Sequence, residues 1–324
     1  MRSTSSTNRL VATLVLTVAC TALSWGQTVP KPGGVGLAES RAALLQWYST
    51  TYPVGNNPYA VAFDGAHVWV ANENSNTVTK LLASTGAVVS SYQVGTLPDG
   101  VAFDGANIWI ANFKDNTVTQ LRASDGSLLG THPVGSKPSG VAFDGTYIWV
   151  ANSGDNTVSK LTTGGSVVGT YSVGSAPNEL AFDGANIWVT NENSNTVTKL
   201  RASDGSVVGT YNVGTSPRGV AFDGAYIWVT NRLDNTVTKL RASDGSMFGS
   251  YSVGTTPFSV TFDGTYIWVA NPDSNNMTKL QASDGSLVGT YGAGTSPLGV
   301  AFDGTNIWVT NFNSNNVTKI GATR

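Results

Sequence analysis

The stretch "FDGAYIWVTN" occupies residues 222–231, and close copies of it occur six more times in this chain of 324 residues. The Phe-Asp-Gly triplet that opens each copy recurs every 40 residues, and once after 39. It begins at Phe63, Phe103, Phe143, Phe182, Phe222, Phe262 and Phe302. A strict period of this length indicates a repeat architecture, in which each unit buries its core against its neighbours.

Each repeat contains four short runs rich in β-forming residues. In residues 216–254 these runs are "GVAF", "YIWVTN", "NTVTKL" and "SMFGSYSV". Asp-Gly follows the first run and Ser-Asp-Gly follows the third, and both are strong signals for tight turns. Four antiparallel strands per repeat are typical of a propeller blade. The tryptophan found once in every copy, such as Trp228, is the large side chain expected to fill the space between blades.

The two ends of the repeat region indicate how the ring closes. The last copy ends after its third run, "NNVTKI", and lacks a fourth. The N-terminal segment "WYSTTYPVG" (residues 47–55) matches the fourth run of a complete copy, "SVVGTYNVG" (residues 206–214). We therefore predict an all-β, seven-bladed β-propeller of four-stranded antiparallel blades over residues 47–322. An N-terminal strand completes the last blade and removes its open edge.

The first 26 residues have the pattern of a signal peptide. Arg2 and Arg9 precede the apolar run "LVATLVLTVACTAL" (residues 10–23), which is too short for a membrane span. We predict a signal peptide over residues 1–26, a linker or N-terminal extension over residues 27–46, and no transmembrane segment. The protein is then secreted or periplasmic. The alternative is a lipoprotein anchored through Cys20, the single cysteine of the chain.

Composition excludes one class of partner and provides no catalytic motif. Only 12% of the residues are charged and the net charge is −2, so the chain has no basic stripe for nucleic acid. The sequence contains no phosphate-binding loop, nucleophile elbow or histidine-rich metal motif. We expect no cofactor, no metal site and no catalytic residue, and we expect a monomer. Asn72, Asp64 and their equivalents in the other copies are interpreted as turn residues and not as a metal-binding ring.

The segments "IWVTNRLDNTVTKL" (residues 227–240) and "VGTSPRGVAFDG" (residues 213–224) resemble the YVTN-type β-propeller repeat. More distantly, the repeat is similar to NHL repeats and to the virginiamycin B lyase propeller. The resemblance implies the propeller fold and tasks that range from binding scaffolds to lyases and lactonases. A lyase of this kind implies a histidine general acid at the central site and a magnesium-binding carboxylate. Neither His67 nor His132 is expected on the face that would hold such a site, so we do not transfer this activity.

The copies differ mainly on one face. If the first strand is innermost, the connections from strand four to strand one and from strand two to strand three lie on the same face, here called the top face. The two Asp-Gly turns lie on the bottom face and vary little, whereas the top-face residues change in almost every copy. The residue after the proline of strand one is in turn Tyr59, Asp99, Ser139, Asn178, Arg218, Phe258 and Leu298. Variation around one mouth of a rigid ring is typical of a binding surface, and relaxed drift at exposed loops is the alternative.

Three further residues are candidates on this face. Phe113 and Phe312 lie in the loops between strands two and three. Glu179 occupies an inner position where four copies have glycine and the other two have Ala60 and Ser259. A carboxylate at this position could orient a ligand or act as an acid or base. The alternative interpretation is an ion pair with Arg218, or a solvated charge in the channel.

The sequence thus favours an exported binding or interaction scaffold. Its top-face loops and channel mouth would hold a protein, a small molecule or a carbohydrate. One alternative is a central-channel enzyme of lyase or lactonase type that uses Glu179 with a divalent cation. The other alternative is a structural protein of the cell surface.

Overall fold

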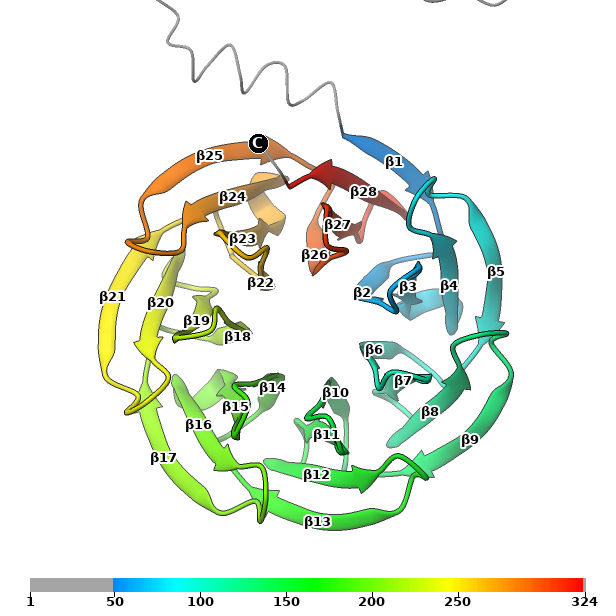
Figure 1. Cartoon of the computed structure of the whole chain (residues 1–324), viewed down its shortest axis with the longest axis horizontal. Helices are drawn as coiled ribbons and strands as arrows, with labels where there is room; N and C mark the ends of the chain where they lie inside the picture. The colour runs from blue at the N-terminus through cyan, green and yellow to red at the C-terminus, as the bar shows by residue number, and fades with distance from the viewer. Residues whose placement is uncertain (1–48, 323–324) are drawn as a thin grey trace, which may run out of the picture. The chain divides into compact units, whose positions relative to one another are not determined.

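The computed structural model describes residues 49–322, which form a ring of seven four-stranded antiparallel sheets (Figure 1). The fold class predicted from the repeat is therefore confirmed. The predicted signal peptide, the linker and Cys20 lie outside the described residues. Within the described part of the chain, no helix is long and apolar enough to cross a membrane.

Six blades each consist of four consecutive strands, of which the first is innermost. Blade 1 contains β2 (Pro58–Phe63), β3 (His67–Asn72), β4 (Thr77–Leu82) and β5 (Val88–Gln93). Blade 2 contains β6 (Pro98–Phe103), β7 (Asn107–Asn112), β8 (Thr117–Arg122) and β9 (Leu128–Pro133). Blade 3 contains β10 (Pro138–Phe143), β11 (Tyr147–Asn152), β12 (Thr157–Thr162) and β13 (Val167–Ser172). Blade 4 contains β14 (Pro177–Phe182), β15 (Asn186–Asn191), β16 (Thr196–Arg201) and β17 (Val207–Asn212).

The remaining blades follow the same order until the ring closes. Blade 5 contains β18 (Pro217–Phe222), β19 (Tyr226–Asn231), β20 (Thr236–Arg241) and β21 (Met247–Ser252). Blade 6 contains β22 (Val260–Phe262), β23 (Tyr266–Asn271), β24 (Asn276–Gln281) and β25 (Leu287–Gly292). Blade 7 contains β26 (Pro297–Phe302), β27 (Asn306–Asn311), β28 (Asn316–Gly321) and β1 (Thr50–Pro53). Single-turn 3₁₀ helices follow the second strand in blades 1, 4 and 6: η1 (Glu73–Ser75), η2 (Glu192–Ser194) and η3 (Pro272–Ser274).

The N-terminal strand closes the ring as the sequence predicted. β1 pairs antiparallel with β28, and Tyr52 lies opposite Val317. The Tyr52 ring packs on Trp308 with 5.7 Å between centroids, as Tyr211 packs on Trp188 at 5.5 Å in a complete blade. The outer edge of β28 is therefore paired within the chain, and the last blade has four strands like the others.

The Asp-Gly turns hold the core tryptophans in place. In blade 5 one oxygen of the Asp223 carboxylate accepts the backbone N–H groups of Ala225 at 2.9 Å and Tyr226 at 2.7 Å. The other oxygen accepts the indole Nε1–H of Trp228 at 2.7 Å. The same three contacts recur in every blade, with the residue equivalent to Asp223 as acceptor. The predicted turn role of these aspartates is confirmed, and the structure adds their contact with the tryptophan.

Each tryptophan fills the space between its own blade and the next. Trp69 of blade 1 is fully buried and packs against Ile108, Ile110 and Leu121 of blade 2. Burial of one large aromatic side chain at each junction contributes roughly 2–3 kcal/mol per blade. The interface role predicted for the tryptophans is therefore confirmed.

A buried lysine, which sequence reasoning missed, also links neighbouring blades. The ammonium group of Lys239 donates to the backbone carbonyl oxygens of Ala282 at 2.7 Å and Ser283 at 3.0 Å in blade 6. The same group lies 4.9 Å from the ring centroid of Trp228, within cation–π range. Equivalent lysines bridge five other junctions: Lys80, Lys160, Lys199, Lys279 and Lys319. In blade 2 Gln120 takes this position.

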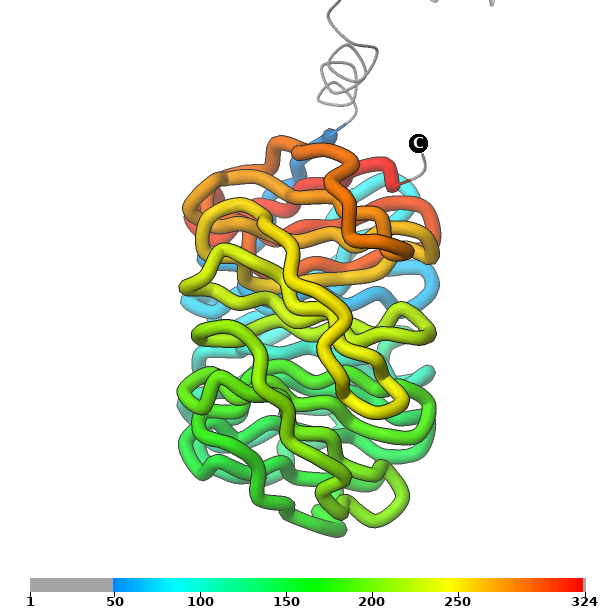
Figure 2. Tube along the Cα trace, turned by 90° about the vertical axis from the view of Figure 1, so that its left-hand side faces the viewer, coloured from blue at the N-terminus to red at the C-terminus, as the bar shows by residue number. Residues whose placement is uncertain are grey.

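The turns of every blade gather on two faces, along the two opposite edges of the ring in its side view (Figure 2). On the top face the loop between β7 and β8 contacts the connection that enters β6, because the Phe113 N–H donates to the Leu97 carbonyl oxygen at 3.0 Å. On the bottom face the Ala123 N–H donates to the Ala106 carbonyl oxygen at 2.9 Å and joins the two Asp-Gly turns. The assignment of loops to the two faces is therefore confirmed.

Candidate functional site

A β-bulge in the inner strand positions the candidate residues. In blade 2 Pro98 pairs with Asn112, and Val101 pairs with Ile110, so β6 contains one extra residue between these pairs. The bulge contains Asp99 and its neighbour Gly100. The same irregularity occurs in every blade except blade 6, where β22 starts only at Val260. A bulge redirects side chains that regular alternation would send to the two faces of a strand.

The inner strands of neighbouring blades approach closely at the small residue of the bulge. A Cβ atom on Gly219 would lie 2.6 Å from the carbonyl oxygen of Phe258, and one on Gly299 would lie 2.5 Å from that of Tyr59. Glycine at these positions therefore leaves room for the backbone of the neighbouring strand. In blade 4 the backbone N–H of Glu179 donates to the Thr190 hydroxyl at 3.1 Å. The same hydroxyl donates to the Arg218 carbonyl oxygen of blade 5 at 2.7 Å, which fixes the two strands beside Glu179.

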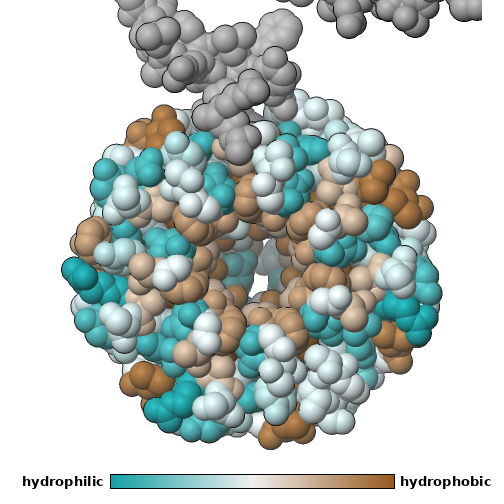
Figure 3. Space-filling view, viewed as in Figure 1, coloured by the Kyte–Doolittle hydropathy of each residue, from teal (hydrophilic) through white to brown (hydrophobic). Residues whose placement is uncertain are grey.

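The channel along the ring axis contains a cavity of about 190 Å³. Viewed down this axis, the surface has a central opening surrounded by hydrophobic residues (Figure 3). Among the residues that line the cavity, Glu179 is the only charged one. Apart from Glu179 and Ser259, the lining residues are glycines or have small or aliphatic side chains: Ala60, Val61, Gly100, Val101, Gly140, Val141, Leu180, Val220, Val260, Gly299 and Val300.

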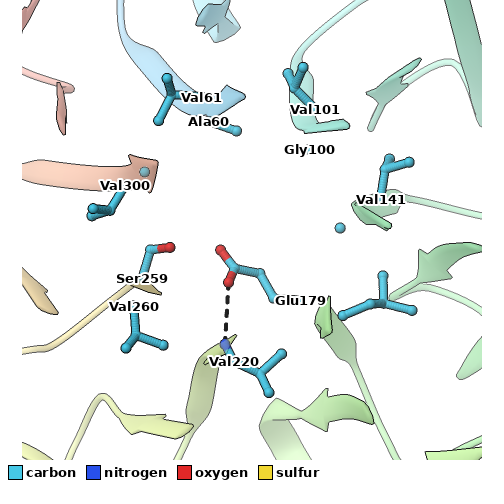
Figure 4. Close-up of a pocket in the computed structure, with 13 residues that line it drawn as sticks. Ala60, Val61, Gly100, Val101, Val141, Glu179, Val220, Ser259, Val260 and Val300 are labelled. Carbon is cyan, nitrogen blue, oxygen red and sulfur yellow. Dashed lines mark hydrogen bonds between the residues drawn. The ribbon is translucent and has the colours of Figure 1, made fainter. Parts of the chain in front are cut away.

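Glu179 points from β14 into this cavity, and the hydroxyl group of Ser259 points toward its carboxylate (Figure 4). One carboxylate oxygen accepts the backbone N–H of Val220 at 3.4 Å, which is a long hydrogen bond. Burial raises the pKa of Glu179 to about 7, and the Val220 N–H, the Ser259 hydroxyl and the charge of Arg218 offset this only in part. Near neutral pH the carboxyl group is therefore divided between its acid and its ionised form.

At the channel mouth, four side chains from blades 1, 5, 6 and 7 meet across the ring. The Arg218 guanidinium donates to the Tyr59 hydroxyl at 3.1 Å and lies 4.7 Å from the centroid of the Phe258 ring. Tyr59 contacts Phe258 edge to face, with 5.5 Å between centroids, and contacts Phe312 at 6.3 Å. Burial raises the pKa of Tyr59, so its hydroxyl stays protonated at neutral pH. We call Tyr59, Arg218, Phe258 and Phe312 the mouth cluster.

The ion-pair partner of Arg218 differs from the one considered from the sequence. Its Nε lies 3.2 Å from a carboxylate oxygen of Glu192, in the loop after β15. The other oxygen of Glu192 accepts the Ser216 hydroxyl at 3.1 Å and lies 3.9 Å from Arg232. No ion pair joins Arg218 to Glu179 among residues 49–322, so that interpretation is wrong. Glu192 was not identified from the sequence, because it is one of many variable residues in the top-face loops. Its position on the blade next to that of Arg218 could have indicated the ion pair.

Asp99 is the second carboxylate near the mouth. Burial raises its pKa to about 7, Arg218 lowers it, and Glu73 and Glu179 raise it further. In the described part of the chain no hydrogen bond reaches the Asp99 carboxylate. Arg218 is committed to Glu192 and Tyr59, so the acidic groups around the mouth exceed the basic ones.

The other sequence candidates lie outside this cluster. Ser139 is buried, and its hydroxyl donates to the carbonyl oxygens of Pro177 at 3.2 Å and Asn178 at 3.1 Å in blade 4. Leu298 is 7% exposed. No hydrogen bond or ring contact between described residues joins the side chains of Asn178 and Phe113 to the mouth cluster.

Both histidines lie away from the channel, as expected. His67 lies 3.3 Å from Asp64 at a bottom turn. His132 lies in the outer strand β9, where its Nε2 is 3.1 Å from the Gln120 side-chain oxygen and its ring packs on Trp109. Across residues 49–322, no three histidine, cysteine, aspartate or glutamate residues form a group that could hold a metal ion.

No family model and no curated protein matches this sequence. Several solved structures share its fold. A hydrazine synthase chain from Kuenenia stuttgartiensis has a TM-score of 0.74 at 21% identity, covering 82% of this chain and 96% of its own. A catalytically inactive variant of virginiamycin B lyase from Staphylococcus aureus, solved with quinupristin, has a TM-score of 0.74 at 18% identity, covering 85% and 99%. A streptogramin B lyase structure has a TM-score of 0.73 at 19% identity, covering 85% and 97%. At these identities the likeness establishes the fold alone.

Proposed function

We propose that this protein is a binding scaffold whose ligand is held at the channel mouth on the top face. The observation that supports this most is the mouth cluster, in which Arg218 of blade 5 reaches Tyr59 of blade 1 across the ring. Blades 1 and 5 are not neighbours, so this contact does not hold one blade to the next. Aromatic rings together with an arginine are the side chains that most often dominate binding surfaces.

The bottom face provides the contrast. Its Asp-Gly turns repeat the same internal hydrogen bonds in blade after blade, for example at Asp223 and Asp263. The top face combines unlike residues on the same backbone frame. A rigid frame with one variable face is how repeat proteins present a ligand site. The N-terminal sequence pattern and the resemblance to the YVTN-type repeat support an exported scaffold, secreted or periplasmic.

Lyase chemistry is not part of this proposal. In the virginiamycin B lyase comparison the inactive variant has a histidine replaced by alanine. The two histidines of this chain, His67 and His132, pack at a bottom turn and on an outer strand. Neither lines the cavity that contains Glu179.

The test is a ligand screen followed by variants on both faces. Small molecules and oligosaccharides are screened by the shift they cause in the melting temperature of the purified chain. Replacing Tyr59, Phe258 and Phe312 together by serine should abolish binding of any ligand found and leave the fold intact, because all three side chains are only partly buried at the mouth. As matched controls, Ser203→Ala and Ser243→Ala change exposed bottom-turn side chains and should preserve binding. Greater loss of binding in the bottom-turn variants than in the mouth variant would contradict the proposal.

A further inference from the structure

The cavity below the mouth cluster has the size of a small organic molecule. Its volume of about 190 Å³ compares with a cavity of roughly 150 Å³ that holds benzene in another protein. A ligand of about six to eight non-hydrogen atoms therefore fits. Six valines line the cavity, including Val61, Val141 and Val300 (Figure 4). These aliphatic side chains can contact an apolar body on the ligand.

One polar feature of the cavity can orient such a ligand. The Glu179 carboxylate has acceptor sites for about four hydrogen bonds, whereas its partners among the described residues are the backbone N–H of Val220 at 3.4 Å and the Ser259 hydroxyl. Ser259 is 5% exposed, and its hydroxyl faces the carboxylate from blade 6. A donor group beside Glu179 and Ser259 would find the charge of the carboxylate and, in the oxygen of the Ser259 hydroxyl that donates to it, a second acceptor within the cavity.

The charges around Glu179 favour a cation over an anion. Arg218 and Asp99 interact electrostatically with Glu179. Tyr59, Glu73 and Glu192 lie near these two residues, and Arg232 lies beside Glu192. Arg218 and Arg232 are the basic groups among them. Arg218 already pairs with Glu192 and Tyr59, and Arg232 lies 3.9 Å from Glu192. The bridging lysines donate to carbonyl oxygens at the junctions between blades and do not line the cavity. An anionic ligand would thus meet carboxylates without a free partner.

We propose that the channel binds a small organic cation, a primary ammonium group on a short apolar body, with the ammonium held between Glu179 and Ser259. This rests on the proposed function, because it places the ligand of that binding site in the channel below the mouth. The ammonium group supplies three donors and the positive charge that Glu179 lacks. The alkyl chain replaces water along the valine wall.

The experiment uses n-hexylammonium as the probe, with 1-hexanol and hexanoate as matched probes of neutral and negative charge. Binding to the full chain is measured by isothermal titration calorimetry at pH 6 and pH 8. Hexylammonium should bind, and its association constant should rise about tenfold from pH 6 to pH 8, because the Glu179 carboxyl with its pKa of about 7 must be ionised. The heat at pH 7 should depend on the ionisation enthalpy of the buffer, since binding releases a proton.

Two variants test the assigned residue. Glu179→Gln keeps the shape of the cavity and should lower the affinity for hexylammonium at least about tenfold at pH 8. Asp204→Asn removes an exposed carboxylate from a bottom turn and should leave the affinity unchanged. Hexylammonium binding that is unaffected by Glu179→Gln overturns the proposal, and so does hexanoate binding as tight as that of hexylammonium.

Failure of this inference can be separated from failure of the proposed function. If none of the three probes binds, but a ligand from the screen binds and depends on Tyr59, the organic-cation assignment is overturned and the mouth remains a binding site. If no probe binds and no screened ligand depends on Tyr59, both are overturned.

Discussion

Replacement of Glu179 by glutamine should make this protein more stable at neutral and alkaline pH. Burial raises the pKa of Glu179 from 4.5 to about 7, so the folded protein holds this proton more tightly than the unfolded chain does. Between these two values the folded state binds more protons, and its stability therefore falls as the pH rises. The contribution of the protonated Glu179 to the stability of the folded protein is fully present below about pH 4. It is lost as the pH rises through about 7.

The magnitude follows from the gap between the two pKa values. At about 1.4 kcal/mol for each pKa unit, a gap of about 2.5 corresponds to up to about 3.4 kcal/mol over the whole range. Most of it, about 2.5 kcal/mol, falls between pH 5 and pH 8. Glutamine cannot ionise, so the free energy of unfolding of the variant relative to the parent should increase by about this amount from pH 5 to pH 8. Glu179 also raises the pKa of Asp99, so the variant lowers the Asp99 pKa and the change in Asp99 adds to the increase in the same direction.

The assay is urea unfolding followed by tryptophan fluorescence, because seven tryptophans are fully buried between blades. Parent and variant are compared at both pH values in the same buffer series. Asp204→Asn is the control, since the pKa of Asp204 is lowered to about 2 and its titration lies below the measured range. A difference between Glu179→Gln and parent that stays constant from pH 5 to pH 8, or that changes in the opposite direction, would refute the reasoning from burial.

Three further predictions concern the frame of the ring. Lys239→Met should lower the free energy of unfolding by about 3 kcal/mol in urea titrations, because two buried carbonyl oxygens lose their donor. Lys239→Gln should lower it less, since the glutamine at this position in blade 2 still forms a hydrogen bond with the next blade. Equal losses in the two variants would argue against the role of the hydrogen bonds. Ala176→Asn should raise the free energy of unfolding by about 0.5–1 kcal/mol, because Ala176 has a φ of 52° and the equivalent Asn57 a φ of 53°; a loss of stability would contradict this. A chain that begins at Asn56 lacks β1 and should melt at least about 5 °C below one that begins at Arg41, and equal melting temperatures would disprove the closing role of β1.

The fold could be predicted almost completely from the sequence because the repeat compares seven versions of one structural unit. Turn residues keep their spacing, so strand order and the two faces follow directly. Ring closure was predicted by aligning the N-terminal segment with the fourth strand of a complete repeat, which matches Tyr52 with Tyr211. In the structure both tyrosine rings pack on a tryptophan. The bulge was not predictable, because an extra residue on one strand has no signature when nearly all copies carry it.

The candidate site was only partly predictable, since its contacts cross the ring. The sequence placed Tyr59, Phe258 and Phe312 on the same face, and the Tyr59 ring contacts the other two. It considered Glu179 as the partner of Arg218, because both belong to inner strands of adjacent blades. The guanidinium instead pairs with Glu192. The length and direction of an arginine side chain decide this choice, and neither can be read from residue spacing.

Blade 2 shows a signal that the sequence did contain. Gln120 replaces the bridging lysine and His132 replaces the outer-strand tyrosine, and their side chains lie 3.1 Å apart. The adjoining turn of blade 3 supplies the Thr163 carbonyl oxygen that Gln120 contacts at 3.1 Å. Two departures from the repeat thus belong to one junction. Departures that occur together in one blade identify contacts, whereas a single departure does not.

Glu179 is a single departure of a different kind. Glycine, alanine or serine at the equivalent positions is sufficient to build the other six blades, so the blade itself does not require a carboxylate there. A group that lowers stability without serving the frame is typical of a functional site, where stability and activity oppose each other. A bound cation would supply the charge that burial leaves uncompensated, and would thereby lower the pKa of Glu179. Ligand binding should therefore stabilise the protein more at pH 8 than at pH 5, the reverse of the trend for the free protein.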